Sequence, residues 1–501
     1  MDNRRRYRNN LTPQQMVDLQ EELREMDQEE EEIERERIAY RKRLQARKKR
    51  AALRRKKQMQ RIRIGAAAAA VLLVVLAGRG IASGASKKKA VENRQQQAEQ
   101  AGVERVKKTA EEQAAAIAEK EQWNVSFSAV GDNLISQRLI DQAKSGSGYD
   151  FTKVYADTAD FIKKHEINWI DVETTINTEI EPSGYPQFST PGENGKALVD
   201  AGFNIFSLAN NHTYDLGAEG ISAAEKYWSS MQEQYKICTT GLASLNAGAS
   251  GSADLTSGYE EQGLAPQTNV IVDEIPVYTC KNGKTVAFLT YVESTNPQSE
   301  SDYAMYEKPE GSSKRVIYTY ERDLIREQIK AADEKADAVV VSCHWGNEDT
   351  HTITDTQQSM AQFLADCGAD LILGDHPHVI QNGAWISAQD GRQVFCIYSF
   401  GNFVSTQEDG DNIVGVALDC TLHFADGEDP EEPEVTIVDP KMVPVITEYG
   451  EEGTNAHVML FSAFTEDMAK KHGIHGYISD PFTVKSIKKM LNDTISEEFR
   501  G

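Results

Sequence analysis

The alternation of short apolar runs with amphipathic segments, which begins at Trp123, restricts the fold of this chain most. Runs such as KTVAFLTYV and DAVVVSCHWG have the length and the β-branched content of buried strands. Segments with helical periodicity lie between them, such as GISAAEKYWSSMQEQY and DTQQSMAQFLADCG. Because buried strands that alternate with helices are typical of covered sheets, we predict an α/β domain over residues 123–501.

The residues before this domain divide into three segments of different composition. Residues 1–63 are highly charged, first acidic and then basic, and predict one long polar helix from about Thr12. Residues 64–86 include the uncharged run IGAAAAAVLLVVLAG, which we interpret as a transmembrane signal anchor; a cleaved signal peptide is the other interpretation. Residues 87–122 are rich in Ala, Glu, Gln and Lys, and predict a helical stalk or a disordered spacer.

Charge is distributed unevenly along the chain. The block from Arg37 to Arg63 contains no acidic residue, whereas the whole chain has a formal net charge of -24. A basic block before an apolar span predicts a cytoplasmic N-terminus near membrane lipid, and an extracytoplasmic main domain in a single-pass protein of the cell membrane. The acidic remainder argues against nucleic acid as a partner, since phosphate backbones bind cationic surfaces.

Six cysteines are spread over the predicted domain, and none lies in a CxxC pair. Most of them stand in apolar, strand-like runs such as VVVSCHWG and VFCIYSF. We therefore predict small buried core residues; a structural disulfide is the other interpretation, and the sequence does not identify its partners. The six are Cys238, Cys280, Cys343, Cys367, Cys396 and Cys420.

Side chains of the kinds that bind metals follow the ends of successive predicted strands. In open α/β sheets the carboxyl ends of the strands are the usual ligand-binding edge. Carboxylates, an Asn-His pair, a further His and a His-x-His motif make up an oxygen-and-nitrogen set large enough for two divalent metals. The residues at these strand ends are Asp132, Asp171, Glu173, Asn210, Asn211, His212, His344, Asp375, His376, His378 and Asn402.

The order of GDN, DVE, LANNHTYDLG, CHWGNE, GDHPHVIQ and YSFGNFV resembles the CapA-type poly-γ-glutamate capsule synthesis family, over roughly 124–403. The resemblance implies a layered αββα sandwich similar to calcineurin-like metallophosphoesterases, with a two-metal centre. It also implies divalent metal ions such as Mn, Zn or Fe. The partners that it implies are an anionic polymer such as poly-γ-glutamate and other membrane proteins of capsule synthesis.

The resemblance assigns roles to individual residues. The metal ligands that it implies are Asp132, Glu173, Asn211, His344, His376 and His378. It implies that His212 faces the substrate as a catalytic acid or base. Residues expected around the metals or against the substrate are Asn210, Asp215, Glu348 and Asn402. Three departures stand out. Leu134 replaces the His of the superfamily's D-x-H motif, Glu173 stands where the superfamily usually has a bridging Asp, and Asp171 replaces the Asn of the family's N-x-E motif. The first metal is then short of a nitrogen ligand, whereas one metal at Asn211, His344 and His376 keeps its ligands.

Three functions of different classes agree with these features. The first is a metal-dependent hydrolase of an envelope polymer or phosphoester, in which His212 protonates the leaving atom. The second is a non-catalytic module of capsule assembly or export, in which a metal holds an anionic polymer. The third is a scaffold whose site has degenerated, which the replacement at Leu134 favours.

Overall fold

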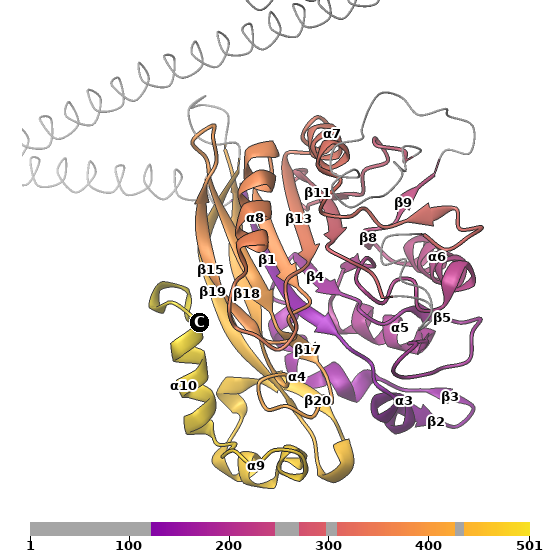
Figure 1. The fold of residues 1–501 in the computed structure, drawn as a ribbon, viewed down its shortest axis with the longest axis vertical. Coiled ribbons are helices and arrows are strands. Elements are labelled where there is room, and N and C mark those ends of the chain that lie inside the picture. Colours follow the sequence, from indigo (N-terminus) through magenta and orange to yellow (C-terminus); the bar gives the residue numbers. More distant parts are fainter. Residues whose placement is uncertain (1–121, 246–269, 297–307, 426–434) are drawn as a thin grey trace, which may run out of the picture. The chain divides into compact units, whose positions relative to one another are not determined.

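The computed structural model describes residues 122–245, 270–296, 308–425 and 435–501 (Figure 1). The predicted charged helix at 1–63, signal anchor at 64–86 and stalk at 87–122, except its last residue, lie outside these ranges. Within the described ranges, no helix combines the length and the apolar character needed to cross a bilayer. The longest helix there, α6 (Gly217–Gln234), is amphipathic, with one buried face. The localisation that we predicted, a single-pass membrane protein with an extracytoplasmic domain, is therefore not supported and is corrected here.

The first sheet is mixed. Strands β1, β4, β7 and β8 are parallel to one another, whereas β18, β19 and β20 continue the sheet antiparallel from β1, and β17 pairs with the end of β1. The strands are β1 (Asn124–Asn133), β4 (Ile167–Asp171), β7 (Ile205–Ser207), β8 (Cys238–Thr240), β17 (Asn402–Val404), β18 (Val414–Phe424), β19 (Val435–Glu448) and β20 (His457–Leu460). The parallel strands bring their carboxyl ends to one edge.

The second sheet has a parallel core with an antiparallel strand at each edge. Strands β11, β13, β14 and β16 are parallel, and β10 and β15 flank them. The strands are β10 (Val277–Thr279), β11 (Thr285–Val292), β13 (Ala338–His344), β14 (Leu371–Asp375), β15 (Ile380–Ser387) and β16 (Gln393–Phe400). In this register His344 lies beside Asp375, so two predicted site motifs are neighbours on adjacent strands.

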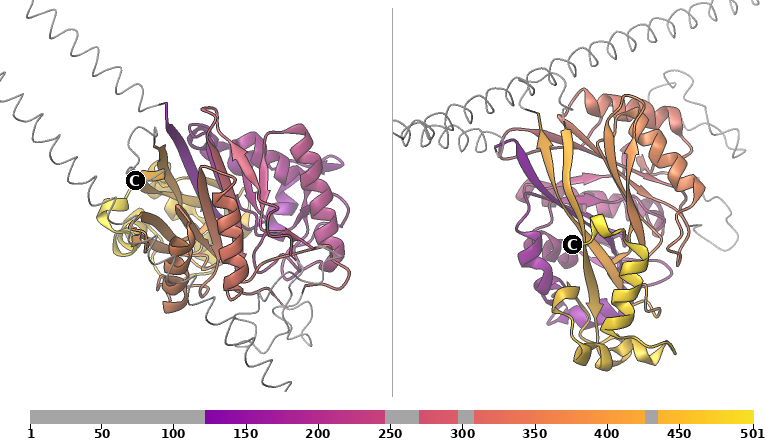
Figure 2. Two further views of the ribbon diagram at one scale, coloured as in Figure 1. Left: turned by 90° about the horizontal axis from the view of Figure 1, so that it is seen from above. Right: turned by 90° about the vertical axis from the view of Figure 1, so that its left-hand side faces the viewer.

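The two sheets pack face to face, and helices cover their outer faces (Figures 1 and 2). Ser207 of β7 faces Thr290 of the second sheet, whereas its neighbour Phe206 packs on Trp228 of α6, with ring centroids 4.5 Å apart. This alternation follows from the two-residue period of a strand. The other main helices are α3 (Gln137–Ala143), α4 (Thr152–Ile162), α5 (Gly192–Ala201), α7 (Arg322–Asp333) and α8 (Asp355–Cys367). The predicted mixed α/β fold is confirmed.

Short strands outside the two sheets pair locally. They are β2 (Lys144–Ser145) with β3 (Gly148–Tyr149), β5 (Ile176–Asn177) with β6 (Thr190–Pro191), and β9 (Ala243–Ser244) with β12 (Lys314–Arg315). All six cysteines lie in the described ranges and are free, and five of them are fully buried while Cys367 is partly buried. The prediction of buried core cysteines is therefore confirmed.

The C-terminal segment packs on β15 and β19, and Figure 1 shows its helix α10 beside these strands. Its elements are η2 (Glu451–Gly453), η3 (Phe461–Ala463), α9 (Glu466–Lys471), η4 (Gly473–Gly476), α10 (Val484–Thr494) and η5 (Glu497–Phe499). Asn382 of β15 exchanges two hydrogen bonds with Ser496, at 2.7 and 3.0 Å. Phe499 packs on Phe395 of β16 with ring centroids 5.1 Å apart. The chain end thus closes one edge of the second sheet.

His472 in this segment is buried among aromatic rings and is held in one protonation state. Its Nε2 donates to the carbonyl of Thr447 at 3.0 Å, and its Nδ1 accepts from the amide of Ile474 at 3.1 Å. Both nitrogens are occupied in the neutral ring, so a second proton has no place. Burial lowers the pKa of His472 to about 4.

This histidine predicts a loss of stability in mild acid. In the unfolded chain His472 has a pKa near 6.5 and binds a proton in mild acid, whereas the folded ring stays neutral down to about pH 4. The contribution of His472 to stability is therefore complete above about pH 6.5 and is lost as the pH falls toward about 4. We expect the free energy of unfolding to fall by about 2 kcal/mol between pH 7 and pH 5 from this group alone. Urea unfolding at both pH values should show a smaller fall in His472→Gln. An equal fall in both proteins would contradict the prediction.

A buried ion pair supports the loop that follows β7. Arg315 and Glu321 are each about 1% exposed, and they form two parallel N–H···O bonds of 2.7 Å. The amide of Val316, next to Arg315, donates to the hydroxyl of Tyr214 at 2.9 Å. Tyr214 belongs to the ANNHTYD motif, so the ion pair shapes the backbone on which this motif rests.

Removing one partner of this pair should destabilise the fold strongly. In Glu321→Gln the guanidinium keeps its charge in a buried place without a counter-charge, which typically costs about 3–5 kcal/mol. The control is Glu179→Gln, which breaks the exposed pair with Lys226 (3.0 Å) and should cost under about 1 kcal/mol. Chemical denaturation measures both. Equal losses in the two variants would refute the assignment.

Candidate metal centre

The structure brings all six predicted metal ligands together at the carboxyl ends of the parallel strands. A chain of short separations connects them. His378 lies 3.0 Å from Asp132 and 3.7 Å from Glu173, and Glu173 lies 3.9 Å from His344. His344 in turn lies 2.9 Å from Asn211 and 3.1 Å from His376. The ligands predicted from strand ends therefore form one cluster that spans both sheets.

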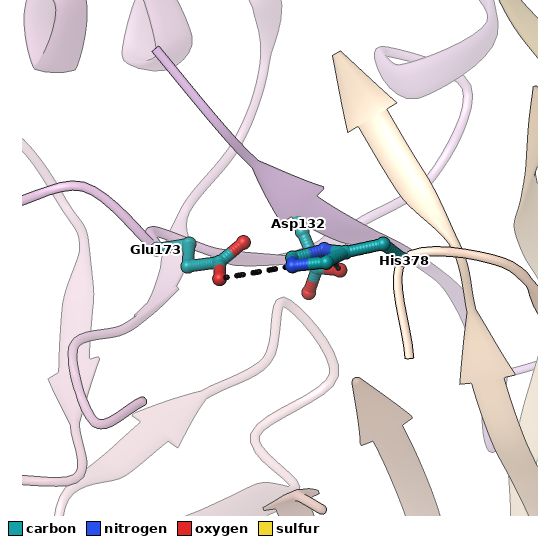
Figure 3. Close-up of side chains that lie close together, drawn as sticks. All are labelled: Asp132, Glu173 and His378. Atoms are coloured by element: carbon teal, nitrogen blue, oxygen red, sulfur yellow. Dashed lines mark hydrogen bonds and ion pairs between the residues drawn. The ribbon is translucent and has the colours of Figure 1, made fainter. Parts of the chain in front are cut away.

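Glu173 is the centre of this cluster. Its side chain is fully buried, and its Oε1 lies 3.7 Å from His378 Nε2, 3.9 Å from His344 Nε2 and 4.0 Å from His212 Nε2. Figure 3 shows how the carboxylates of Asp132 and Glu173 flank the ring of His378. Neither oxygen of Glu173 has a hydrogen-bond partner among the described residues. A buried carboxylate that has no hydrogen-bond partner and faces several imidazole nitrogens is a donor set that fits a divalent cation.

One half of the cluster consists of Asn211, His344 and His376. Asn211 Oδ1 lies 2.9 Å and His376 Nδ1 lies 3.1 Å from His344 Nε2. Two ligand atoms that share one ion at about 2.1 Å, at a right angle, lie roughly 3 Å apart, so these separations suit a common cation. Asp171 Oδ2 lies 3.7 Å from His344 Nδ1, on the side of the ring that points away from Asn211 and His376. This separation is too long for a hydrogen bond, so Asp171 lies beside the His344 ring without a hydrogen bond to it.

The other half consists of Asp132, His378 and Glu173. His378 Nδ1 lies 3.0 Å from Asp132 and 3.1 Å from Asn402 Oδ1. The side-chain nitrogen Nδ2 of Asn402 donates to the side chain of Gln407 and to the carbonyl of Asn412. The side-chain oxygen Oδ1 of Asn402 must therefore face the His378 ring. His378 then donates from Nδ1 and presents Nε2 to Glu173. Asn402, which we expected around the metals or against the substrate, thus contacts the ring of His378.

Leu134 leaves this second half with three protein ligands. The side chain of Leu134 is buried and offers no ligand atom. Ligand atoms of Asp132, Glu173 and His378 all lie within 4.8 Å of one another, as do those of Asp132, Asp171 and His344. Three protein ligands with an open position are the pattern of catalytic rather than structural zinc. The missing histidine is therefore compatible with an ion that also binds water or substrate.

The pKa values of the cluster reflect its burial. Burial first, and then neighbouring negative charges, raise the pKa values of Asp171, Glu173 and Asp375 well above their usual range. Burial, followed by neighbouring imidazoles, lowers the pKa of His376 to about 3 and that of His344 well below 6.5. Both rings are then neutral at physiological pH, which is the form that binds a metal.

His378 differs from the other two histidines of the cluster. Burial alone lowers its pKa, but the carboxylates of Glu173 and Asp132 outweigh burial and raise the pKa to about 10. A cation held by the cluster would be the largest local charge, so it would favour the unprotonated form of His378. Metal binding by this centre should therefore release protons.

The backbone of the His-x-His motif is strained. His376 and His378 have φ angles of 96° and 59°, in a region that residues other than glycine rarely adopt. The carbonyl of Pro377 between them accepts from the amide of Asp349 at 2.9 Å, which helps to hold the turn. Strain of this kind is concentrated at functional sites. This turn, with positive φ at both histidines, brings both rings to the cluster.

His212 stands at the edge of the cluster and has its own carboxylate partner. Its Nδ1 lies 2.8 Å from Asp215 Oδ2, and the same oxygen accepts from the amide of Phe188 at 3.0 Å. The Phe188 ring meets the His212 ring edge-on, with centroids 4.7 Å apart. With Nδ1 donating to Asp215, the Nε2 of His212 faces Glu173 and is available to move a proton.

Two other predicted residues surround the cluster without joining it. Asn210 accepts from the amide of His212 at 3.0 Å and donates to the carbonyl of Val172 at 3.0 Å, so it shapes the loop. Glu348 is exposed, and its negative charge contributes to raising the pKa values of Glu173 and His378. Glu348 therefore adds negative charge near the centre from the solvent side.

Sequence reasoning missed one residue, Asn296. Its amide donates to the carbonyl of Asn211 at 2.8 Å, and its side-chain nitrogen lies 3.2 and 3.4 Å from the two ring nitrogens of His212. Asn296 follows β11 by four residues, just as the other site residues follow their strands. That position was the signal that could have identified it.

Comparison with known proteins agrees with the motif order. The family model described as "Bacterial capsule synthesis protein PGA_cap" matches residues 126–256 and 269–407. "Capsule biosynthesis protein CapA" of Bacillus anthracis is 28% identical over 303 residues, 59% of this chain and 63% of that protein. "PGA biosynthesis protein CapA" of Bacillus subtilis (strain 168) is 25% identical over 286 residues, 56% of this chain and 64% of that protein. The chain thus spans just under two thirds of these relatives. Since the family model covers more than half of the chain, the chain belongs to the bacterial capsule synthesis protein family PGA_cap.

Proposed function

We propose that this protein acts in capsule biosynthesis as a metal-dependent hydrolase of an envelope polymer, such as poly-γ-glutamate, or of a phosphoester. The relatives named for capsule and PGA biosynthesis support the pathway. One observation carries the chemistry: the buried Glu173 carboxylate has no hydrogen-bond partner among the described residues and lies within 4.0 Å of three imidazole nitrogens. The packed sheets and the order of the motifs support a metallophosphoesterase-like classification.

The residues divide into those that hold the cation and those that act on the substrate. Asn211, His344, His376 and Glu173 would hold one ion, and Asp132, His378 and Glu173 a second. A bound divalent ion supplies Lewis-acid activation of water and of the scissile group. His212 would give a proton from Nε2 to the leaving atom, while Asp215 holds the ring in the required orientation. Asn402 would keep His378 directed at the centre.

Metal content and turnover test this proposal together. The full chain, purified after growth with Mn, Zn and Fe, should retain at least one divalent ion per molecule by mass spectrometry. It should also shorten poly-γ-glutamate, or release nitrophenol from a chromogenic phosphoester, and a chelator should stop the reaction. A protein that binds none of the three metals overturns the proposal.

A second candidate is a polymer-binding or export module in which the ion bridges protein and polymer. The formal net charge of -24 favours it, since a polyanion is repelled by an acidic protein unless cations intervene. This candidate predicts that poly-γ-glutamate binds only with divalent ions and is released intact. Polymer of unchanged length after prolonged binding would support it over hydrolysis.

A further inference from the structure

We infer that Asn296 is a positioning residue that fixes the amide of the ligand Asn211 and restrains the ring of His212. This inference rests on the proposed metal site. Asn296 follows β11, a strand to which sequence reasoning gave no part in the site. It is partly exposed and lies between the two residues of the Asn-His pair on which the proposed chemistry depends.

The contacts with Asn211 fix the direction of its side chain. The backbone amide of Asn296 donates to the carbonyl of Asn211 at 2.8 Å. The side-chain nitrogen of Asn211 points to Asn296 Oδ1, at the long distance of 3.5 Å. An Asn ligand presents its oxygen to the metal, so its NH₂ group needs an acceptor on the far side. Asn296 is this acceptor, and it leaves Asn211 Oδ1 directed at the 2.9 Å contact with His344.

The side-chain NH₂ group of Asn296 lies against the ring of His212. Its Nδ2 is 3.2 Å from Nδ1 and 3.4 Å from Nε2 of the ring. An atom almost equally distant from both ring nitrogens cannot lie along the in-plane lone pair of either one, so the NH₂ group lies over the face of the ring. The opposite orientation of the amide would set two NH₂ groups against each other, which excludes it. Asp215 therefore holds the ring by its edge and Asn296 holds it by its face.

The segment that carries Asn296 is itself anchored to the site. The amide of Glu293 donates to the carbonyl of His344 at 2.9 Å, and its carboxylate accepts from the amide of Gly346 at 2.7 Å. Thr295 is buried, with its hydroxyl 3.0 Å from that of Tyr318. Residues 293–296 thus contact both the HWG and the ANNH motifs, and the position of the Asn296 amide is determined by the fold.

Two substitutions separate the two contacts. Asn296→Ala removes the acceptor for Asn211 and the group over His212. Asn296→Asp keeps an oxygen toward Asn211 but replaces the NH₂ group over the ring. We expect Asn296→Ala to lower metal affinity about 10–100-fold, the usual effect of an orienting partner, and Asn296→Asp to restore most of it. Turnover at saturating metal should fall in both variants.

The test uses the full chain and competition with a chromophoric chelator for Mn and Zn, with Asn492→Ala on the exposed face of α10 as the matched control. Melting temperature is measured for each variant to exclude unfolding. Wild-type affinity in Asn296→Ala, or equal losses in the Ala and Asp variants, overturns the inference. Loss in Ala with rescue in Asp supports it. Because affinity needs no turnover, a wild type that binds no metal refutes the proposed function instead, and the two failures remain distinct.

Discussion

Replacing His376 by alanine is expected to strip the divalent ion that Asn211, His344 and His376 would hold, and to abolish turnover with it. His376 Nδ1 lies 3.1 Å from His344 Nε2, and its pKa of about 3 keeps the ring neutral and ready to bind. Alanine removes one of the two nitrogen ligands of this half and leaves His344 as its single imidazole, beside Asn211 and Glu173. Metal analysis of the dialysed protein and a turnover assay at added metal measure the two losses.

Thermal stability gives an independent measure of the same loss. A ligand at a hundred times its dissociation constant stabilises the folded state by about 2.7 kcal/mol. Added metal should therefore raise the melting temperature of the wild type by several degrees and that of His376→Ala by clearly less. The control is His423→Ala, because His423 contacts Asn124 at the start of β1, whereas the centre lies at the other end of that strand. A variant at position 376 that keeps full metal content and affinity would contradict the assignment.

The sequence was sufficient to predict which residues meet but not how each one acts. The strand ends of β1, β4, β7, β13 and β14 converge because parallel strands share one carboxyl edge, and the two-residue period determines which side chains face inward. Asp171 and Glu173 show the limit of this reasoning. Both face the centre, yet the longer Glu173 reaches three imidazoles, whereas Asp171 stops behind His344. Side-chain length and rotamer decide which of the two carboxylates reaches the imidazoles. The periodicity of a strand gives no information on either property.

Contacts between distant segments were also beyond the sequence. Phe188 reaches His212 from a loop before α5, and Asn296 reaches it from the end of β11. Phe188 carries no ligand atom, and neither residue lies in one of the motifs that mark the site in the sequence. The buried pair of Arg315 and Glu321 is similar, because charged residues six apart in a sequence are ordinarily solvated. Such contacts depend on tertiary packing, which a strand-and-helix pattern does not specify.

Replacing His212 by alanine should lower turnover about 10²–10⁴-fold while leaving metal content nearly unchanged. The ring stands beside the ligand Asn211, but its Nδ1 is committed to Asp215 at 2.8 Å and its Nε2 lies 4.0 Å from Glu173. A ring held in this way can deliver a proton from Nε2 to a leaving oxygen or nitrogen. Since the ion keeps Asn211, His344 and His376, the loss falls on the chemical step.

Asp215→Asn provides the comparison for His212→Ala, because it keeps the shape of the side chain but weakens the restraint on the ring. Its turnover should fall between those of the wild type and His212→Ala, again with metal retained. The competing explanation is that His212 serves only the loop, through its contacts with Asp215 and the Phe188 ring. Under that explanation His212→Ala has a lower melting temperature than the wild type, but the same turnover per folded molecule. Turnover, metal content and melting temperature measured on the same preparations therefore distinguish a proton donor from a structural histidine.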